Sequence, residues 1–497
     1  MSRTLQEAIV AAPADDQPRL VFADWCEARG EGGRAEFVRV QLQRRQYPDW
    51  DVRQVALKVR ERALIEQHGA KWRAELPNLA GVQWAPSFVR GWPNEARVDS
   101  FERLVEVQDD LAQVPGFSSV VVSWPASASE AQALRPIPGL RELTIERAIR
   151  DPNEPAWLAA APFLSTVRRL HLVDQYSATP GHEPLLSSPH LTELQALFMM
   201  RANIGREGVP ALVADGRLPK LTSLFLSERG SNETSWSYWD GGLTDEAMDL
   251  LATWPGLARI ETLELPDNRL LGPELERLFR SPHLGARLRY LNLQGILSWG
   301  DIPWRDLGKD VQLAELDLTR RGFNDPEEFE AFADVPGLRA FRHLKISDTN
   351  FEEPSWFVDL LSAPFTSTLE VLEGRSIDME GDDLLNCLSE ASLPALHTLD
   401  VRRNWEVREA SAQALVRSSV GRGLRSLSLG SARFRHPVFF GEALAQTVAD
   451  VQSEALLDLT IEPMTDGGQA ILRKSVLGQR LDKQGGLRFS SAPSEEA

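Results

Sequence analysis

The sequence predicts an α/β solenoid in which parallel strands alternate with helices over much of its 497 residues. Stretches of the form apolar-x-x-apolar-x-apolar recur every 23 to 39 residues between about Phe117 and Ile461, and most of the spacings lie between 24 and 30 residues. Between these stretches the apolar residues follow the period of about 3.6 that is typical of helices. A repeat of this length favours an extended binding surface over a buried catalytic pocket.

The first 75 residues lack the repeat and predict a small helical domain. Thr4-Leu-Gln-Glu7 is typical of a capping box, so we expect a first helix there. Pro18 is suited to the first turn of a second helix, which the glycines of residues 30–33 should end. Residues 35–47 and 51–68 predict a third and a fourth helix.

A motif in this helical segment resembles the bacterial repeat-companion domain. The resemblance is carried by Pro18-Arg-Leu-Val-Phe-Ala-Asp-Trp-Cys-Glu-Ala-Arg-Gly30, followed by Arg34-Ala-Glu-Phe-Val-Arg-Val-Gln41. It covers about 45 residues strongly, and Cys26 stands where that family more often has Leu. The resemblance implies a leucine-rich-repeat partner downstream and implies no activity.

The helical segment also carries a set of charged residues with two interpretations. They could form a recognition site, or they could form a salt-bridge and capping network that holds short helices together, which we favour because small helical modules often fix their packing in this way. The residues are Arg19, Asp24, Glu27, Arg29, Glu36 and Arg39.

The remaining chain divides into a connecting segment, the repeats and a C-terminal segment. Residues 76–116 should connect the helices to the repeats, with strands between Val82 and Val98 that cap the first repeat. Residues 464–497 should contain a cap helix at 469–477 and a disordered tail. Between them, residues 117–463 predict about 12 to 13 units, whose apolar stretches begin at Phe117, Leu140, Val167, Leu191, Leu221, Ile260, Leu288, Leu313, Phe341, Leu369, Leu396, Leu424 and Leu456.

A strand followed by a helix at roughly this period resembles the ribonuclease-inhibitor-like leucine-rich repeat. Residues 325–335 illustrate the helix, with Asp325 as a plausible N-cap and Pro326 in the first turn. The resemblance implies a horseshoe with a parallel sheet on its concave side and helices on its convex side. The Asn of that family, which bonds the backbone in the turn three residues after the last Leu, is present as Asn268 and Asn404 only.

Composition and motifs exclude several classes of function. The net charge of −18 argues against nucleic acid as the main partner, and no apolar run is long enough for a membrane span. The N-terminus does not read as a secretory signal, and Cys26 and Cys387 read as reduced, buried residues, so we expect a cytoplasmic protein. Nucleotide-binding, metalloprotease and hydrolase signatures are absent, and the histidines are dispersed. We therefore expect no enzyme activity, no cofactor and no metal site.

The candidate binding surface follows from strand alternation. The third and fifth residues of each apolar-x-x-apolar-x-apolar stretch should point away from the helices, and parallel strands about 4.8 Å apart should place the fifth residues in a ladder. His171, Phe225 and Glu315 are among these outward positions. We predict a mostly acidic face that binds a protein partner; a solvated face without a partner is the alternative. The predicted partner-binding residues on this face are Glu264, Tyr290, Asn292, Asp317, His343, Lys345, Glu373 and Asp400.

A second candidate surface is a loop that lengthens one repeat. The spacing between Leu221 and Ile260 is about 11 residues above the usual period, and the excess contains Trp236, Tyr238 and Trp239. Trp and Tyr dominate interface hot spots, so we predict that these residues bind the partner; the alternative is that they fold back onto the neighbouring repeat. Trp299 and Trp304 form a smaller analogue.

Together these observations predict a non-enzymatic protein–protein interaction scaffold that uses the concave face and the aromatic loop. A sensor or regulatory subunit of a multi-protein bacterial signalling or defence system is the alternative, and it differs only in what the partner does. An enzyme of an unrecognised type, such as a ubiquitin-ligase-like protein, would need a further domain with a reactive Cys, and no such domain follows residue 463.

Overall fold

The computed structural model describes residues 3–489 apart from 174–181, 202–207, 215–216, 228–242, 269, 297–301, 324–325, 352, 380, 406, 433–438 and 452–453. The chain forms two compact units. Unit 1 comprises Met1–Gln46, Leu64–Leu270 and Arg280–Leu288; unit 2 comprises Tyr47–Ala63, Leu271–Phe279 and Arg289–Ala497. The domain boundaries placed at residues 75, 116 and 463 stay predictions.

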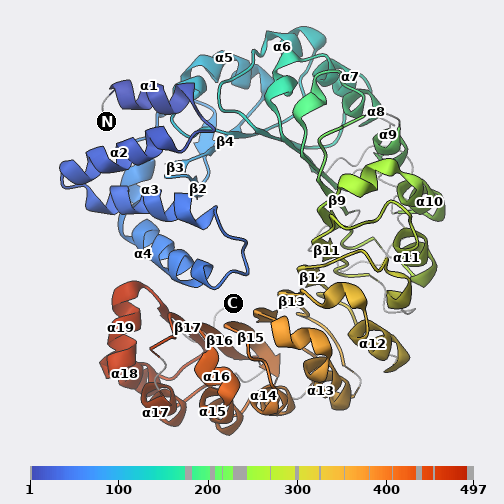
Figure 1. Cartoon of the computed structure of the whole chain (residues 1–497). Coiled ribbons are helices and arrows are strands. Elements are labelled where there is room, and N and C mark those ends of the chain that lie inside the picture. The colour runs from blue at the N-terminus through green and yellow to red at the C-terminus, as the bar shows by residue number, and fades with distance from the viewer. Residues whose placement is uncertain are drawn as a thin grey trace. The chain divides into compact units, whose positions relative to one another are not determined.

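Four helices begin the chain, as the sequence predicts (Figure 1). They are α1 (Arg3–Ala11), α2 (Gln17–Ala28), α3 (Gly32–Arg44) and α4 (Arg53–Arg73). The first three enclose an apolar cluster that includes Phe22, Cys26 and Val38, and Trp92 from the connecting segment packs into the same cluster. The first three helices are therefore held to the connecting segment by burial of apolar surface.

The strands of unit 1 follow one another in the sheet in chain order. β1 pairs with β4 in antiparallel orientation, each strand from β4 to β10 is parallel to the next, and β2 and β3 form a separate hairpin. The strands are β1 (Val82–Trp84), β2 (Phe88–Val89), β3 (Trp92–Pro93), β4 (Glu95–Val98), β5 (Ser119–Val122), β6 (Glu142–Glu146), β7 (Arg169–Val173), β8 (Ala196–Met200), β9 (Ser223–Ser227) and β10 (Thr262–Glu264).

Helices between these strands lie along one face of the sheet of unit 1 (Figure 1). They are α5 (Phe101–Ala112), α6 (Ala128–Ala133), α7 (Glu154–Ala159), α8 (His182–Leu186), α9 (Val209–Val213) and α10 (Asp245–Thr253). The start of α10 illustrates their design: the Thr244 side chain accepts a hydrogen bond from the Ala247 N–H. This N-cap satisfies one of the free amide groups at the helix start.

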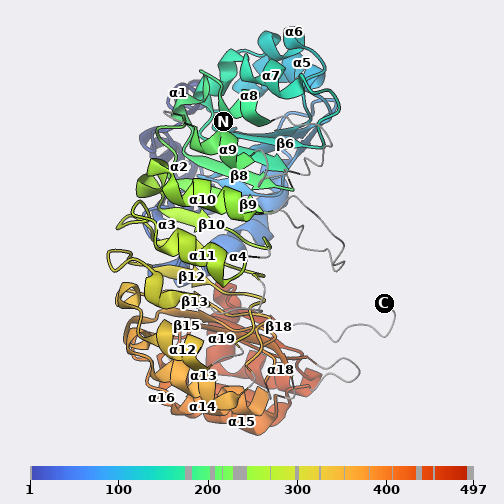
Figure 2. The same cartoon turned by 90° about the vertical axis from the view of Figure 1, so that its right-hand side faces the viewer.

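Unit 2 repeats the same arrangement, with its strands again in chain order and parallel to their neighbours (Figure 2). The strands are β11 (Tyr290–Asn292), β12 (Glu315–Asp317), β13 (His343–Lys345), β14 (Val371–Glu373), β15 (Thr398–Trp405), β16 (Ser426–Ala432), β17 (Asp458–Glu462) and β18 (Leu487–Phe489). The helices are α11 (Gly272–Phe279), α12 (Pro326–Ala333), α13 (Pro354–Ser362), α14 (Gly381–Glu390), α15 (Glu409–Arg417), α16 (Ser419–Gly423), α17 (Glu442–Val451), α18 (Asp466–Lys474) and α19 (Val476–Gln484).

The register of these strands confirms the predicted fold class, a leucine-rich-repeat solenoid. Leu316, Leu344 and Leu372 are paired across successive strands and are almost fully buried beneath the helices. The C-terminal segment continues this order, because two helices, α18 and α19, replace the single helix expected at 469–477, and β18 adds a further parallel strand. Among the helices of the described residues, none has the length and apolar character to cross a bilayer.

One repeat begins three residues later in the sequence than predicted. The apolar stretch expected to begin at Leu191 coincides with a short 3-10 helix, Leu191–Glu193, and the strand of this repeat is β8. Its buried positions are Leu194, Leu197 and Met199, so the stretch begins at Leu194. The corrected frame restores an even spacing, because Val167, Leu194 and Leu221 are each 27 residues apart.

The two Asn residues of the turn bond the backbone as the family resemblance implies. Asn268 Nδ2 donates to Leu226 O at 2.6 Å. Asn404 Nδ2 donates to Gly374 O and Val401 O at 2.9 Å each, and its Oδ1 accepts from the Ile377 N–H at 2.8 Å. Both side chains are buried, so these bonds satisfy backbone groups that water does not reach.

Other residue types take this position in the neighbouring repeats. In one repeat the Thr349 hydroxyl donates to Ser347 O at 3.2 Å. In another, Arg321 extends into the interior and its Nη2 donates to Glu328 Oε1 and Oε2 at 2.5 and 2.7 Å. Both side chains of this ion pair are 1% exposed. This position is therefore occupied by three chemically different side chains.

For Trp304 the structure supports the alternative interpretation of the aromatic residues, in which the ring packs onto neighbouring repeats. Its side chain is 1% exposed, and its ring centroid lies 4.9 Å from that of Phe332 and 5.9 Å from that of Phe279. The residue is part of the core of unit 2. Trp299, which was grouped with it, lies outside the described residues.

Residues 47–63 are an integral part of unit 2 although they come early in the chain. The backbone oxygen of Trp50 lies 3.0 Å from His397 Nε2. Arg62, on α4, forms an ion pair of 3.3 Å with Asp458 of β17, and Asp458 also binds Arg488 at 3.0 Å. An early segment of the sequence is thus fixed against the last repeats.

Candidate binding surfaces

The predicted ladder exists in unit 2 as a continuous row across neighbouring strands. Asn292, Asp317, Lys345, Glu373 and Asp400 pair with one another in sequence order from β11 to β15. Tyr290 and His343 belong to the adjacent row, two residues earlier on their strands. Glu264 belongs to unit 1, where it pairs with Phe225 on β9. The use of this row for binding a partner stays a prediction.

Three ladder residues have a structural role that the sequence analysis missed. The side-chain oxygens of Asn292, Asp317 and Asp400 accept hydrogen bonds from the N–H two residues later, at 2.9, 2.9 and 3.2 Å. This is the Asx turn, which bends the chain away from the strand. All three are less than 8% exposed. They therefore hold the turn of the repeat and present little surface to a partner.

The ladder is also less acidic than its sequence suggests, because cations lie between the carboxylates. Lys345 Nζ is 2.6 Å from Glu315 Oε1. Arg375 lies between Glu373 and Asp400, at 3.2 and 2.8 Å. Arg402 binds Asp400 at 2.8 Å and approaches Glu462 at 3.6 Å. Arg375 and Arg402 come after the predicted outward positions of their repeats, so strand alternation alone did not place them in this network.

His343 occupies the centre of this network between two carboxylates. Its Nδ1 is 3.1 Å from Glu315 Oε1 and its Nε2 is 3.0 Å from Glu373 Oε1. Burial alone would lower the pKa of His343, but the two carboxylates outweigh burial and raise it above its ordinary value. The same contacts, together with Lys345, hold the pKa of Glu315 at about 2 despite its burial. The network therefore favours a protonated histidine.

A variant of His343 should make the stability of the protein respond differently to pH. A raised pKa in the folded state contributes stability that is complete below the unfolded value of about 6.5 and is lost as pH rises through the folded value. We expect the stability advantage of the wild type over His343→Gln to grow as pH falls from about 9 to about 5. Urea unfolding at several pH values measures this advantage, and a constant difference between the two proteins would contradict it.

In unit 1 the sheet face opposite the helices carries an aromatic row across β7, β8 and β9. The rings of His171 and Phe198 are stacked, with centroids 4.1 Å apart and planes 3° from parallel. Phe198 and Phe225 follow at 5.8 Å. Val173 and Met200 lie beside them, two residues further along the same strands. All five side chains are partly exposed.

The sequence analysis missed Phe198 because of the three-residue error in the frame of its repeat. The even spacing of 27 residues between Val167, Leu194 and Leu221 would have placed Phe198 at the fifth position of the stretch, between His171 and Phe225. Ion pairs flank the row: Arg169 Nη2 lies 2.6 Å from Glu142 Oε2, and Arg97 binds Glu146. The surface thus combines apolar rings with paired charges.

The aromatic loop residues Trp236, Tyr238 and Trp239 lie outside the described residues, so their role stays a prediction. For the charged set of the N-terminal helices, the contacts support the structural interpretation. Arg39 Nη2 on α3 binds Asp24 Oδ1 and Glu27 Oε2 on α2, at 2.7 Å each. These ion pairs hold two helices together. Among the described residues no group of His, Cys, Asp or Glu side chains is arranged to hold a metal ion.

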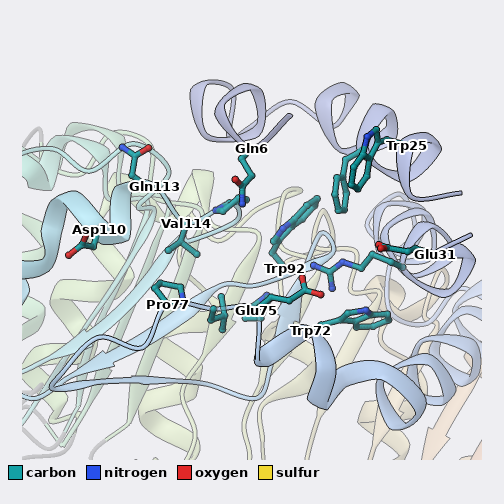
Figure 3. Close-up of a pocket in the computed structure, with 15 residues that line it drawn as sticks. Gln6, Trp25, Glu31, Trp72, Glu75, Pro77, Trp92, Asp110, Gln113 and Val114 are labelled. Carbon is teal, nitrogen blue, oxygen red and sulfur yellow. The ribbon is translucent and has the colours of Figure 1, made fainter. Parts of the chain in front are cut away.

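Unit 1 also contains a cavity of about 620 Å³ that the sequence analysis did not predict. Figure 3 shows three tryptophans around it: Trp25 from α2, Trp72 from α4 and Trp92 from β3. Arg34 of α3 is buried beside them, with its Cζ 4.8 Å from the Trp72 ring centroid and 5.4 Å from that of Trp92. The walls of the cavity suit a flat or apolar group.

The charge of Arg34 is only partly compensated in this cavity. Burial lowers the pKa of Arg34 to about 10, and the nearby carboxylate of Glu75 opposes this shift. Its Nε and Nη1 have no hydrogen-bond acceptor among the described residues. Arg34 belongs to the Arg-Ala-Glu-Phe part of the repeat-companion motif, where the sequence marked it as a motif residue without a role.

Comparisons with known proteins add no functional information. No family model matches the chain, and no curated protein matches it. Among solved structures, the chain is similar to the complex of Rad7 and Elc1 in yeast, at 15% identity over 77% of this chain and 81% of that chain, with a TM-score of 0.39. It is also similar to the leucine-rich repeat-containing protein LegL7 from Legionella pneumophila, at 12% identity over 70% of this chain and 94% of that chain, with a TM-score of 0.33.

Proposed function

We propose that this chain is a non-enzymatic scaffold that recognises a protein partner through the face of its sheet opposite the helices. The observation that carries the proposal is the aromatic row of unit 1, formed by His171, Phe198 and Phe225 with Val173 and Met200 beside it. Aromatic and Met side chains are enriched at protein interfaces, and rigid rings lose little conformational entropy when they are buried.

Charged groups around this row would supply specificity. The Glu142–Arg169 pair lies on the neighbouring strands β6 and β7, and complementary charges on a partner would select orientation and increase the rate of association. In unit 2 the more accessible members of the predicted surface, Tyr290, Lys345 and Glu373, would make a second set of contacts. Trp236, Tyr238 and Trp239, which follow β9 in the sequence, are proposed as a third set.

The proposal is tested by capture of the partner on the full chain. Tagged wild-type protein is incubated with an extract of the native host, the enriched protein is identified by mass spectrometry, and its affinity for purified wild type and for Phe198→Ser/Phe225→Ser is measured. We expect the double variant to weaken binding at least about tenfold, because buried aromatic side chains dominate interface energetics.

Val358→Ser provides the matched control. Val358 is an exposed apolar residue on α13, which lies on the helical side of unit 2, and its side chain is 45% exposed. This change should leave the affinity unaltered. An equal loss of affinity in both variants, or an unchanged affinity in the aromatic variant, would contradict the proposed use of the sheet face. Glu373→Gln tests the second set, because Glu373 has no role in an Asx turn.

We further propose that residues 1–75 are a repeat-companion-type module of a bacterial, cytoplasmic protein, followed by a connecting segment to residue 116 and repeats to residue 463. The motif from Pro18 to Gln41 supports the first part of this proposal. The cysteines support a reducing compartment, since both are free thiols, and burial raises the pKa of Cys26 to about 11.

A further inference from the structure

A second cavity of unit 1, of about 380 Å³, is lined by six arginines and by no carboxylate. It lies where the N-terminal helices meet the residues that precede β5, β6, β7 and β8. The arginines are Arg19, Arg45, Arg90, Arg141, Arg168 and Arg169. Such a concentration of positive charge is unexpected in a chain whose net charge is −18.

The repeat itself brings two of these arginines together. Arg141 and Arg168 occupy the same position in successive repeats, just before β6 and β7. The Arg168 N–H donates to Arg141 O at 2.7 Å, so their backbones are neighbours at the edge of the sheet. Like charges at directly adjacent strand positions repel each other.

Segments outside the repeats supply three more of the arginines. Arg19 comes from α2, Arg45 follows the end of α3, and Arg90 lies in the turn between β2 and β3. The backbone of Arg90 is left-handed, with φ at 54°, a conformation that non-glycine residues rarely adopt. Its side chain donates to Pro13 O at 2.5 Å and Ala14 O at 2.9 Å. Arg90 therefore anchors this wall of the cavity.

Two carboxylates outside the lining form ion pairs with three of the six arginines. Asp16 binds Arg90 and lies 3.7 Å from Arg45. Glu142 binds Arg169 at 2.6 Å. Arg19, Arg141 and Arg168 have no ion-pair partner among the described residues. Arg19 is 2% exposed, and its Nε has no hydrogen-bond acceptor there either.

Burial is the main cause that lowers the pKa of three arginines of the cavity, and neighbouring arginines add to it, while Asp16 opposes the shift for Arg19 and Arg45. Burial, followed by the charge of Arg90, lowers the pKa of Arg19 to about 10. Burial and then Arg168 lower the pKa of Arg141. Burial and then Arg90 lower the pKa of Arg45. These cations repel one another, and a bound anion would relieve the repulsion.

We propose that this arginine cavity binds a small anion that carries two or more phosphoryl groups. Guanidinium groups match phosphate oxygens in geometry and charge and remain protonated at neutral pH. Three arginines without an ion-pair partner exceed what one phosphoryl group needs, so a diphosphate matches the site better than a single phosphate. The cavity adjoins the aromatic row through Arg169, whose partner Glu142 also contacts His171. A small anion bound among the arginines would be additional to the proposed protein partner.

The surrounding charge favours a compact ligand over a long polyanion. A nucleic acid or another extended polyanion gains affinity from many phosphate contacts along a basic surface. The net charge of −18 opposes such contacts outside the cavity, whereas a small anion needs only the cavity itself. We therefore assign the site to a diphosphate-type compound. The experiment compares it with an oligonucleotide, which represents the extended polyanion.

The experiment is isothermal titration calorimetry on the full chain with inorganic pyrophosphate, inorganic phosphate and a short oligothymidylate. We expect pyrophosphate to bind at least about tenfold more tightly than phosphate, and Arg168→Gln to weaken pyrophosphate binding about tenfold or more, because a charge-assisted contact is lost. Arg135→Gln is the matched control, since Arg135 forms an exposed ion pair with Asp109 elsewhere in unit 1. This control should bind pyrophosphate as the wild type does.

Thermal unfolding of the same proteins gives a second readout. Arg168 is partly exposed and has no ion pair, so Arg168→Gln should fold, and without ligand it should melt no lower than the wild type. Pyrophosphate should raise the melting temperature of the wild type more than that of the variant. The proposal is overturned if phosphate and pyrophosphate bind alike, if Arg168→Gln binds pyrophosphate unchanged, or if the oligothymidylate binds more tightly than pyrophosphate.

Discussion

Replacing Arg321 with Met is expected to destabilise unit 2 by about 3–5 kcal/mol, because it leaves the Glu328 carboxylate buried without its cation. Both side chains of this ion pair are 1% exposed. Glu328 Oε1 also accepts the Ile302 N–H at 3.0 Å, so the carboxylate cannot turn toward water without losing a second bond. The cost comes from desolvation of an unpaired charge rather than from the loss of one attraction.

Urea unfolding followed by circular dichroism measures this effect, with Arg408→Met as the control. Arg408 forms an ion pair of 3.3 Å with Asp382 in the same unit, but its side chain is 76% exposed. Such exposed pairs contribute about 0–1 kcal/mol, so the control should differ little from the wild type. Replacing both members of the buried pair by apolar residues should restore most of the lost stability. An equal, small loss for Arg321→Met and Arg408→Met would show that the buried charges are not desolvated.

The second large effect is expected for Asn404→Ala, which should destabilise unit 2 by about 3 kcal/mol. The Asn404 amide satisfies Gly374 O, Val401 O and the Ile377 N–H, and the side chain is 0% exposed. Removing it takes a hydrogen-bond partner from three buried backbone groups, and leaving such groups unsatisfied costs more than the lost bonds themselves.

Asn386→Ala is the matched control for this prediction, because Asn386 is an exposed residue of α14 and Ala has the higher helix propensity. The midpoint of urea unfolding should fall for Asn404→Ala and stay equal or rise for Asn386→Ala. If Asn404→Ala unfolds at the wild-type midpoint, the prediction is wrong, and water or a shift of the backbone must replace the hydrogen bonds of the Asn404 amide.

The sequence carried enough information to predict the repeat and its register. Leu316, Leu344 and Leu372 recur at the same position of their repeats, and a parallel sheet with helices on one face is the arrangement that buries all of them. The predicted start of one repeat was wrong, because Leu191 is an apolar residue three positions before the true start of the stretch. Periodicity alone did not separate these two frames, although even spacing favours the second.

The electrostatics of the candidate surface could be predicted less well. Alternation identified Asp317 and Asp400 as outward residues, but not that their oxygens hold the turn or that Arg375 and Arg402 lie between the acids. These contacts depend on the path of the chain after each strand, which the strand pattern does not contain. The arginine cavity escaped prediction for a related reason, because its arginines come from α2, the end of α3, the β2–β3 turn and two repeats.

The contact of residues 47–63 with the last repeats has a consequence for biosynthesis. In solenoids each repeat contacts only its neighbours and folding can propagate from repeat to repeat, so folding can accompany translation. Arg62 precedes its partner Asp458 by 396 residues. At about 5–20 residues per second, the ribosome needs roughly 20–80 s to make that partner. During that interval the first residues of unit 2 have left the ribosome, but β17, which carries their partner Asp458, has not yet been made. In a nascent chain that stops before β17, these residues cannot form that contact.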